Sequence, residues 1–372
     1  MTMPSAGERE AVPRTPADWA KAACDAVMST FAPEELPPAG KWHYHQGVFL
    51  AGALQVWERT GDRRYFDYTK RYVDHLVDEL GNVVVAKGEL DAIQAGLLLF
   101  VLEDETGDAR YREAARKLRA LFGTFNRTRE GGFWHKDHYP YQMWLDGLYM
   151  GGVFAARYAL RYGEPELVDM VLHQERLMRQ GTLRGDGLLV HAWDESRRAP
   201  WADPATGKAP EVWGRALGWY GVALAEIREA LPKDHPARGD LAAKLGALAE
   251  ALVRHQDAEC GLWYQVVDKG GRPDNWLELS CSSLFVYILA EAVRAGAADP
   301  ALLEAARCGF AGITARVEWD EEGRFVLPDI CIGTGVGDYA HYIARPRSRN
   351  DLHGVGTFVW ACMALERAAS GG

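Results

Sequence analysis

Two kinds of helical pattern alternate along the chain. In the first kind, apolar residues recur every three or four positions with charged residues between them. After Asp62, for example, Tyr65, Tyr68, Tyr72 and Val73 follow this spacing. Such a helix buries one face and leaves the other in water. We predict six of these outer helices, over residues 16–31, 62–79, 108–124, 164–179, 236–255 and 298–315.

The second kind of helix is apolar on every side and rich in small residues, which indicates burial all round and close approach of neighbouring backbones. Each of these inner helices follows an outer helix. The alternation over the whole chain predicts an all-α fold, an (α/α)6 barrel with six inner and six outer helices. We predict the inner helices over residues 43–57, 91–103, 146–160, 214–229, 280–294 and 352–367.

We expect residues 1–372 to form a single barrel domain. An open α-solenoid shows the same alternation, but its terminal repeats need a polar outer face. The last inner helix is as apolar as the central ones from Leu352 to Leu365, so a closed ring is favoured. About the first 15 residues mix charge and proline and are expected to form a flexible arm.

The six connections that lead from an outer to an inner helix are long, and long loops commonly carry function. They contain nine of the 13 tryptophans. Flat aromatic rings at a barrel mouth suit the apolar faces of sugar rings, and the alternative is that these rings pack the loops themselves. The nine are Trp42, Trp134, Trp144, Trp193, Trp201, Trp213, Trp263, Trp276 and Trp319.

Composition and charge exclude several classes of function. The formal net charge is −10 and no basic stripe is present, which argues against a nucleic-acid partner. The apolar runs are too short for a membrane span, and no apolar leader marks export, so we expect a cytoplasmic protein without membrane contact. Six scattered cysteines form neither a disulfide framework nor a zinc motif. A monomer and a homodimer both fit.

Polar residues gather where the predicted inner helices begin. A barrel brings these helix N-termini to one opening, where their positive dipole ends can hold an anionic group without a metal. A carboxylated sugar fits such an opening, and we expect neither a metal nor a cofactor. The residues concerned are His43, His45, Asp91, Asp146, Arg215, Ser280, Ser282, Asp351 and His353.

Asp91 and Asp146 form the carboxylate pair that we expect to carry the chemistry. Each could instead be an ordinary helix N-cap. Asp146 lies among apolar and aromatic residues that disfavour its charge, and a like charge at Asp91 would add to this effect, so Asp146 is suited to giving and taking a proton. The sequence leaves the sign of its net pKa shift open.

His191 and Arg215 are candidate substrate contacts. His191 follows a short apolar run in a long loop and is either a substrate contact or a buried structural histidine. Arg215 lies between Trp213 and Trp219, where it could bind a substrate carboxylate in bidentate fashion or pair with an acidic residue of the protein.

Seven motifs occur in order between Lys41 and Glu366. With them the chain resembles glycoside hydrolase family 105, the unsaturated rhamnogalacturonyl hydrolases, which are related to the unsaturated glucuronyl hydrolases of family 88. That family has the (α/α)6 fold, in agreement with the helix alternation. The motifs are Lys41–Phe49, Gly88–Gln94, Gly131–Lys136, Tyr141–Met150, His191–Ser196, Trp213–Tyr220 and Asn350–Gly356.

The resemblance implies an enzyme of pectin degradation. It would remove the 4,5-unsaturated uronic acid that a lyase leaves at the non-reducing end, with the unsaturated rhamnogalacturonan disaccharide as substrate. In the family's scheme Asp146 protonates C4 of the double bond and assists water to add at C5, and Asp91 binds the sugar and tunes Asp146. The residues that match its substrate pocket are Trp144, His191, Trp213, Arg215 and Trp219.

Several alternatives stay open at this point. The rim segment, residues 334–349, matches no pattern that identifies the second sugar, so unsaturated glucuronyl units from ulvan or glycosaminoglycans are also possible substrates. The same barrel could be a conventional inverting glycosidase with Asp91 and Asp146 as base and acid. A sugar-binding barrel without catalysis is the third reading.

Overall fold

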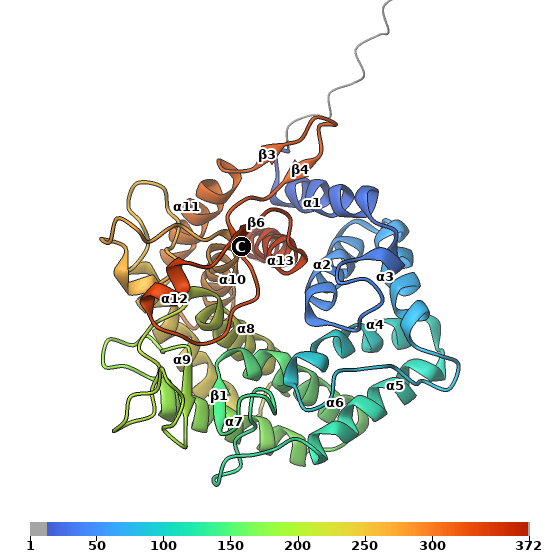
Figure 1. Cartoon of the computed structure of the whole chain (residues 1–372). Helices are drawn as coiled ribbons and strands as arrows, with labels where there is room; N and C mark the ends of the chain where they lie inside the picture. The colour runs from blue at the N-terminus through green and yellow to red at the C-terminus, as the bar shows by residue number, and fades with distance from the viewer. Residues whose placement is uncertain (1–12, 371–372) are drawn as a thin grey trace, which may run out of the picture.

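The inner helices stand side by side around a common centre and the outer helices surround them (Figure 1). The computed structural model describes residues 13–370. The inner ring consists of α2 (Tyr44–Thr60), α4 (Leu97–Thr106), α6 (Phe154–Tyr162), α8 (Gly214–Ala230), α10 (Leu279–Arg294) and α13 (Leu352–Ser370). The outer ring consists of α1 (Pro16–Thr30), α3 (Arg63–Leu76), α5 (Ala109–Ala120), α7 (Glu166–Thr182), α9 (Ala237–Val253) and α11 (Leu302–Thr314). The predicted alternation is confirmed.

Helix α3 shows how an outer helix is specified. The Asp62 side chain caps its first turn by accepting a hydrogen bond from the backbone N–H of Arg64. Tyr65, Tyr68 and Tyr72 are buried on one face, while the intervening charged residues stay at the surface. The helix therefore packs on α2 through a single apolar stripe.

The ring closes where the last inner helix meets the first. Helix α13 packs on both α10 and α2 (Figure 1). Gly356 allows this approach, because a Cβ atom at its position would lie 2.7 Å from the backbones of Val48 and Phe49. A solenoid would leave these two helices apart, so the contact confirms the closed barrel.

Two inner helices begin later than predicted, and both differences concern the candidate catalytic residues. The helix expected from Asp91 starts with two short 3-10 turns, η2 (Leu90–Ala92) and η3 (Gln94–Gly96), before α4. The helix expected from Asp146 starts with a π-helical turn, η5 (Leu148–Val153), before α6. The reason is that the backbone just before each turn is hydrogen-bonded to another loop: Leu90 N to His135 O, and Leu145 N to His191 O.

Short hairpins and turns occupy the loops. Strand β1 (Gln142–Trp144) pairs with β2 (Ala192–Asp194), β3 (Glu318–Trp319) with β4 (Phe325–Val326), and β5 (Ile330–Cys331) with β6 (Arg347–Ser348), all antiparallel. Between β5 and β6 lies the short helix α12 (Tyr339–Ile343). Single 3-10 turns occur at η1 (Pro33–Glu35), η4 (Leu121–Gly123) and η6 (Val267–Lys269).

The predicted N-terminal arm lies mostly outside the described residues 13–370. Thr15 is the N-cap of α1, where its hydroxyl accepts from Asp18 N at 3.2 Å and its own N–H donates to the Asp18 carboxylate at 3.1 Å. The chain is therefore fixed to the barrel from this point on.

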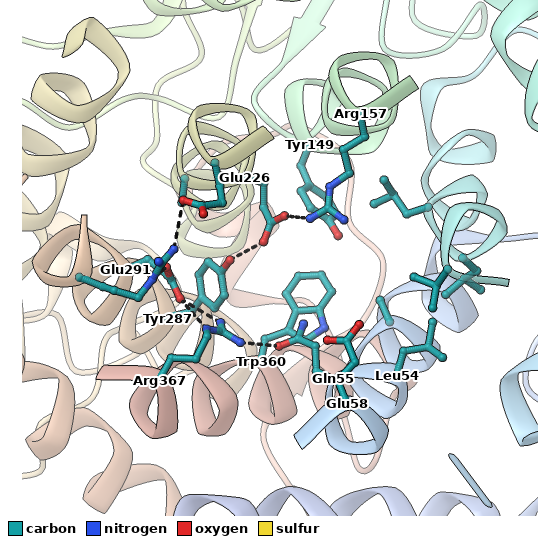
Figure 2. A pocket seen from close by; sticks show the side chains of 17 residues that line it. Leu54, Gln55, Glu58, Tyr149, Arg157, Glu226, Tyr287, Glu291, Trp360 and Arg367 are labelled. Carbon is teal, nitrogen blue, oxygen red and sulfur yellow. Dashed lines mark hydrogen bonds and ion pairs between the residues drawn. The ribbon is translucent and has the colours of Figure 1, made fainter. Parts of the chain in front are cut away.

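A cavity of about 320 Å³ lies where the C-terminal halves of the inner helices converge (Figure 2). Arg157 forms an ion pair with Glu226, and Glu291 binds both Arg294 at 2.6 Å and Arg367 at 2.9 Å. These arginines lie toward helix C-termini, where positive charge complements the helix dipole. We call this space the far cavity. No helix in the described part of the chain combines the length and apolarity that a membrane crossing needs.

Candidate active site

A second cavity, of about 430 Å³, lies at the opposite end, where the inner helices begin. Five of the polar residues predicted to meet there line it: His43, His45, Asp91, Asp146 and Arg215. The other lining residues are Tyr44, His135, Lys136, Tyr139, Trp144, Met150, Trp213, Gly333, Thr334, Gly335 and Arg345. Ser280, Ser282, Asp351, His191, Trp219 and His353 are not in contact with this space.

Asp91 is held by two basic neighbours. Its carboxylate lies 2.6 Å from Lys136 Nζ and 3.4 Å from His135 Nε2. Backbone pairing of Glu89 with Lys136 brings these residues together. Burial disfavours the charge on Asp91, but His135 and Lys136 outweigh burial and hold the pKa of the carboxyl below its ordinary value. Asp91 is thus an ion-paired group and not a helix cap.

Asp146 has a different environment. The register of β1 and β2 pairs Trp144 with Ala192, which places His191 beside Asp146. His191 Nε2 lies 3.2 Å from Asp146 Oδ2, and neither atom has a partner with the full geometry of a hydrogen bond among the described residues. Burial raises the pKa of Asp146, but the neighbouring His191 and His135 together outweigh burial, and the net pKa is lowered. Without a ligand this carboxylate is ionised and has spare acceptor capacity.

Aromatic rings surround these groups. Trp144 stacks on His135, with ring centroids 4.4 Å apart, and lies 4.7 Å from Tyr139. His191 lies between Trp144, at 5.3 Å, and Trp213, at 4.7 Å. Trp144 and Trp213 line the cavity, so a sugar ring there meets two indoles.

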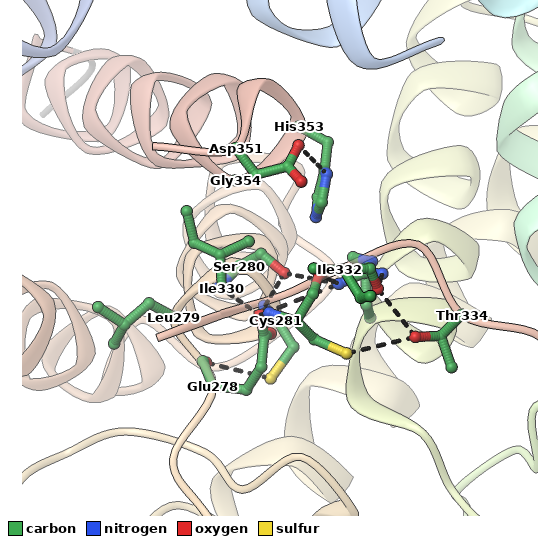
Figure 3. Close-up of polar contacts among 12 residues, drawn as sticks. Glu278, Leu279, Ser280, Cys281, Ile330, Ile332, Thr334, Asp351, His353 and Gly354 are labelled. Atoms are coloured by element: carbon green, nitrogen blue, oxygen red, sulfur yellow. Dashed lines mark hydrogen bonds and ion pairs between the residues drawn. The ribbon is translucent and has the colours of Figure 1, made fainter. Parts of the chain in front are cut away.

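Arg215 is almost fully buried and holds the rim of the cavity. Its Nη1 and Nη2 donate to the carbonyls of Cys331 and Ile332, at 2.5 and 2.8 Å. Glu278 supports the same strand by accepting from Cys331 N at 2.9 Å (Figure 3). Arg215 Nη1 also lies 4.0 Å from the Glu278 carboxylate, so an acidic residue and two backbone oxygens of the protein engage this guanidinium.

The rim segment, which matched no pattern in the sequence, forms one wall of the cavity. Thr334, Gly335 and Arg345 line it. Arg345 is held in place, with Nε donating to Thr334 Oγ1 at 3.0 Å and Nη2 donating to Gly333 O at 2.5 Å. Arg345 takes part in no ion pair among the described residues, so its guanidinium adds positive charge to this wall of the cavity.

His45, Asp351 and His353 form a cluster at the starts of α2 and α13. Their donor atoms lie within 4.8 Å of one another, which makes them the group that could hold a metal ion in residues 13–370. The His353 ring, which is fully buried, lies 2.8 Å from the Asp351 carboxylate, and His45 lies 3.5 Å from it. Although this contact is close, both ring nitrogens of His353 lack a partner with the geometry of a hydrogen bond among the described residues.

Comparison with known proteins adds to this geometry. A model described as Glycosyl Hydrolase Family 88 matches residues 19–369. The chain belongs to this family. The solved structure of a family 105 glycoside hydrolase from C. acetobutylicum ATCC 824 is 36% identical, and the match covers 94% of this chain and 99% of that one with a TM-score of 0.89.

The chain is also similar to two proteins whose names state an enzymatic activity. The unsaturated rhamnogalacturonyl hydrolase YesR of Bacillus subtilis is 28% identical over 253 residues, 65% of this chain and 68% of its own. The unsaturated glucuronyl hydrolase of Bacillus sp. GL1 shares the fold, with a TM-score of 0.72 at 16% identity over 96% of this chain and 97% of its own. The family 88 protein is a glycoside hydrolase with an α/α barrel.

Trp219 and most of the loop tryptophans lie outside the wall of the candidate active-site cavity. Trp219 packs in the barrel interior, stacked on Tyr149 at 4.9 Å and edge-on to Trp360 at 6.0 Å. Most loop tryptophans likewise serve packing; Trp263, for example, is fully buried and donates to Leu252 O. The aromatic surface predicted for the mouth is therefore smaller than the nine tryptophans implied.

Sequence reasoning missed four residues of the site. His135 and Lys136 lie in one of the seven motifs, and that position was the available signal. Arg345 and Tyr342 belong to the rim segment, where no motif marks them. Tyr342 Oη lies 2.7 Å from His191 Nδ1, so the rim also reaches the histidine next to Asp146.

Proposed function

We propose that this glycoside hydrolase removes the 4,5-unsaturated uronic acid from the non-reducing end of oligosaccharides made by polysaccharide lyases. We further propose Asp146 as the proton carrier and Asp91 as the carboxylate that binds the sugar and tunes it. His43, His45, Trp144 and Trp213 are the proposed substrate contacts at the cavity wall. His191, Arg215, Trp219 and His353 support this wall from behind or from within the barrel.

The observation that carries the proposal is the unequal state of the two carboxylates. Asp91 is ion-paired with Lys136 at 2.6 Å, which makes it a poor proton acceptor. Asp146 contacts only a histidine and keeps an oxygen without another partner among the described residues. A conventional inverting glycosidase needs two carboxylates that both exchange protons. Hydration of an enol ether needs one.

The chemistry then proceeds as follows. Protonated Asp146 gives its proton to C4, and the C4=C5 bond becomes a C4–H bond with an oxocarbenium ion at C5. Water adds at C5 and returns a proton to the Asp146 carboxylate. The resulting hemiketal opens by cleavage of the bond between C5 and the ring oxygen, and the sugar at C1 is released from the open-chain product.

Binding of the substrate favours the protonated form of Asp146, which the proposed mechanism needs. Asp146 is ionised in the empty site, but the uronate brings a second negative charge and displaces water, and both effects raise the pKa of Asp146. Lys136, Arg345 and the positive ends of the inner helices balance the uronate charge. Binding and protonation of Asp146 are thereby coupled.

The unsaturated rhamnogalacturonan disaccharide is our proposed substrate, which would give the protein a part in pectin degradation. The likeness to YesR of Bacillus subtilis, an unsaturated rhamnogalacturonyl hydrolase by name, supports this choice. Unsaturated glucuronyl disaccharides of the ulvan and glycosaminoglycan type are the competing substrates. They differ in the second sugar, which lies toward the rim in this scheme.

The test is turnover of lyase-made disaccharides, followed by loss of the ultraviolet absorbance of the conjugated double bond. We expect wild type to consume the rhamnogalacturonan disaccharide and to leave its saturated counterpart intact. In heavy water the product must carry deuterium at C4, detectable by mass spectrometry and NMR. Cleavage of the saturated sugar, or a product without deuterium, would establish the conventional glycosidase and reject the hydration scheme.

A further inference from the structure

Tyr342 connects the rim to the proposed proton carrier. It lies on α12, is fully buried, and places its Oη 2.7 Å from His191 Nδ1. The other ring nitrogen of His191, Nε2, lies 3.2 Å from Asp146 Oδ2. The three side chains therefore form a continuous chain of polar contacts from the rim to the carboxylate.

The neighbours of Tyr342 decide where the protons lie. Gly337 N–H donates to Tyr342 Oη at 3.2 Å, so the oxygen already acts as an acceptor. Burial raises the pKa of Tyr342 well above its ordinary value, so the hydroxyl keeps its proton. The short contact to His191 Nδ1 gives this proton an acceptor, provided that Nδ1 is unprotonated.

The tautomer of His191 with its proton on Nδ1 is disfavoured by the neighbours of both ring nitrogens. With a proton on Nδ1, the Tyr342 hydroxyl proton would be buried without an acceptor, and the lone pair of Nε2 would face the Asp146 carboxylate. Each of these arrangements costs free energy in a site excluded from water. With the proton on Nε2, the Tyr342 hydroxyl has an acceptor in Nδ1, and the Nε2–H lies 3.2 Å from the Asp146 carboxylate, which disfavours a bare nitrogen lone pair at that place.

We propose that Tyr342 is a positioning residue whose hydroxyl holds His191 in the Nε2–H tautomer, so that a hydrogen-bond donor stays directed at Asp146. Because Thr334, Gly335 and Arg345 of the same segment line the cavity, the segment that meets the substrate also sets the donor for the proton carrier. The kinetic part of this inference rests on the proposed function; the tautomer part does not.

The tautomer is measured by long-range ¹H–¹⁵N correlation of histidine side chains in the substrate-free full chain, with His191 assigned through its loss in His191→Gln. Wild type must show a protonated Nε2 and an unprotonated Nδ1 at neutral pH. In Tyr342→Phe we expect the Nδ1–H form to appear. Tyr339→Phe is the matched control, since Tyr339 lies on the same short helix and donates instead to Asp274 at 2.7 Å.

Kinetics supply the second readout. In Tyr342→Phe we expect kcat about tenfold lower with KM within about twofold of wild type, as for the loss of one hydrogen bond to a charged group. The alkaline limb of the pH profile of kcat/KM should move up by about one unit, because Asp146 loses the donor that lowers its pKa. Tyr339→Phe should change neither quantity.

The outcomes separate this inference from the proposed function. A protonated Nδ1 or a doubly protonated His191 in wild type overturns the inference, even if Tyr342→Phe fails to fold. An unchanged tautomer and an unchanged pH profile in a folded Tyr342→Phe also overturn it. Absence of turnover on every unsaturated disaccharide rejects the proposed function and leaves the tautomer result as the test of Tyr342.

Discussion

The two ends of the barrel enclose cavities of similar size but of different chemical character. The cavity at the helix N-termini measures about 430 Å³ and the far cavity about 320 Å³, and both are lined by charged and aromatic residues. In the far cavity Arg157 pairs with Glu226 and Glu291 pairs with two arginines, while Glu58 has no hydrogen bond or ion pair among the described residues (Figure 2). At the other end Asp146 faces a histidine and retains an oxygen without another partner in the described chain. The two ends therefore differ in the partners of their carboxylates: arginines bind Glu226 and Glu291 in the far cavity, whereas a lysine and histidines lie beside Asp91 and Asp146.

The largest expected effect comes from removing the proton carrier. Asp146→Asn should lower kcat roughly a thousandfold, the scale of general acid–base catalysis, because an amide cannot deliver the proton to C4. The melting temperature should change little, since no counter-ion is left unpaired. Turnover by ultraviolet absorbance and thermal unfolding measure the two quantities. Near-normal turnover in a folded variant would assign the proton transfer to another group.

A substitution in the far cavity should lower stability and leave turnover nearly unchanged. Arg157→Leu leaves Glu226 without its cation, and we expect a loss of about 2 kcal/mol in the free energy of unfolding, less than for a fully buried pair. The Arg157 side chain is 43% exposed, which reduces the cost. kcat and KM should stay within about twofold of wild type. A large rise in KM would show that the far cavity also takes part in substrate binding.

Acidification should weaken the active-site end through His45. Burial lowers the pKa of His45 from 6.5 to about 3, so the folded chain keeps this ring neutral where the unfolded chain protonates it. Stability is therefore lost as pH falls below 6.5, by about 2 kcal/mol at pH 5. Chemical denaturation of wild type and His45→Gln at several pH values measures this. Equal slopes in both proteins would assign the acid sensitivity to other groups.

The smallest effect concerns Trp219, which lies between the two cavities in the barrel interior. Trp219→Phe should cost about 1–2 kcal/mol of stability through lost packing against Tyr149 and Trp360. KM for the disaccharide should not change, whereas Trp213→Phe, at the cavity wall, should raise it. Steady-state kinetics and urea unfolding of both variants test this. A raised KM in Trp219→Phe alone would restore the substrate-contact role predicted from the sequence.

Helix periodicity was sufficient to predict the barrel, because each outer helix must show one apolar face and each inner helix must be apolar all round. The positions of Asp91 and Asp146 followed from the same pattern, as both precede inner helices. The residues that surround these two aspartates could not be predicted from helix periodicity. Lys136 reaches Asp91 through an irregular loop, and His191 reaches Asp146 through a two-stranded pairing of segments about 50 residues apart. Neither pairing has a periodic signal.

The hydrogen-bond partners of Arg215 also could not be predicted from the sequence. The sequence gives its neighbours, Trp213 and Trp219, but not its acceptors, which are backbone oxygens more than 100 positions later. Every residue has such an oxygen, so no side-chain pattern marks the partner. The same holds for the rim, whose Tyr342 and Arg345 become relevant only when the chain folds them over the cavity.

The closure of the ring determines when this enzyme can first act. The N–H of Ala17 on α1 donates to Glu366 on α13, a contact between residues 349 positions apart, and the rim precedes α13 directly. During synthesis the earlier helices form an open arc with their apolar inner faces uncovered, a state prone to aggregation. Contacts of such high sequence separation also slow folding. Activity must therefore appear late in folding, when α13 joins α2, α10 and α1 and completes the ring.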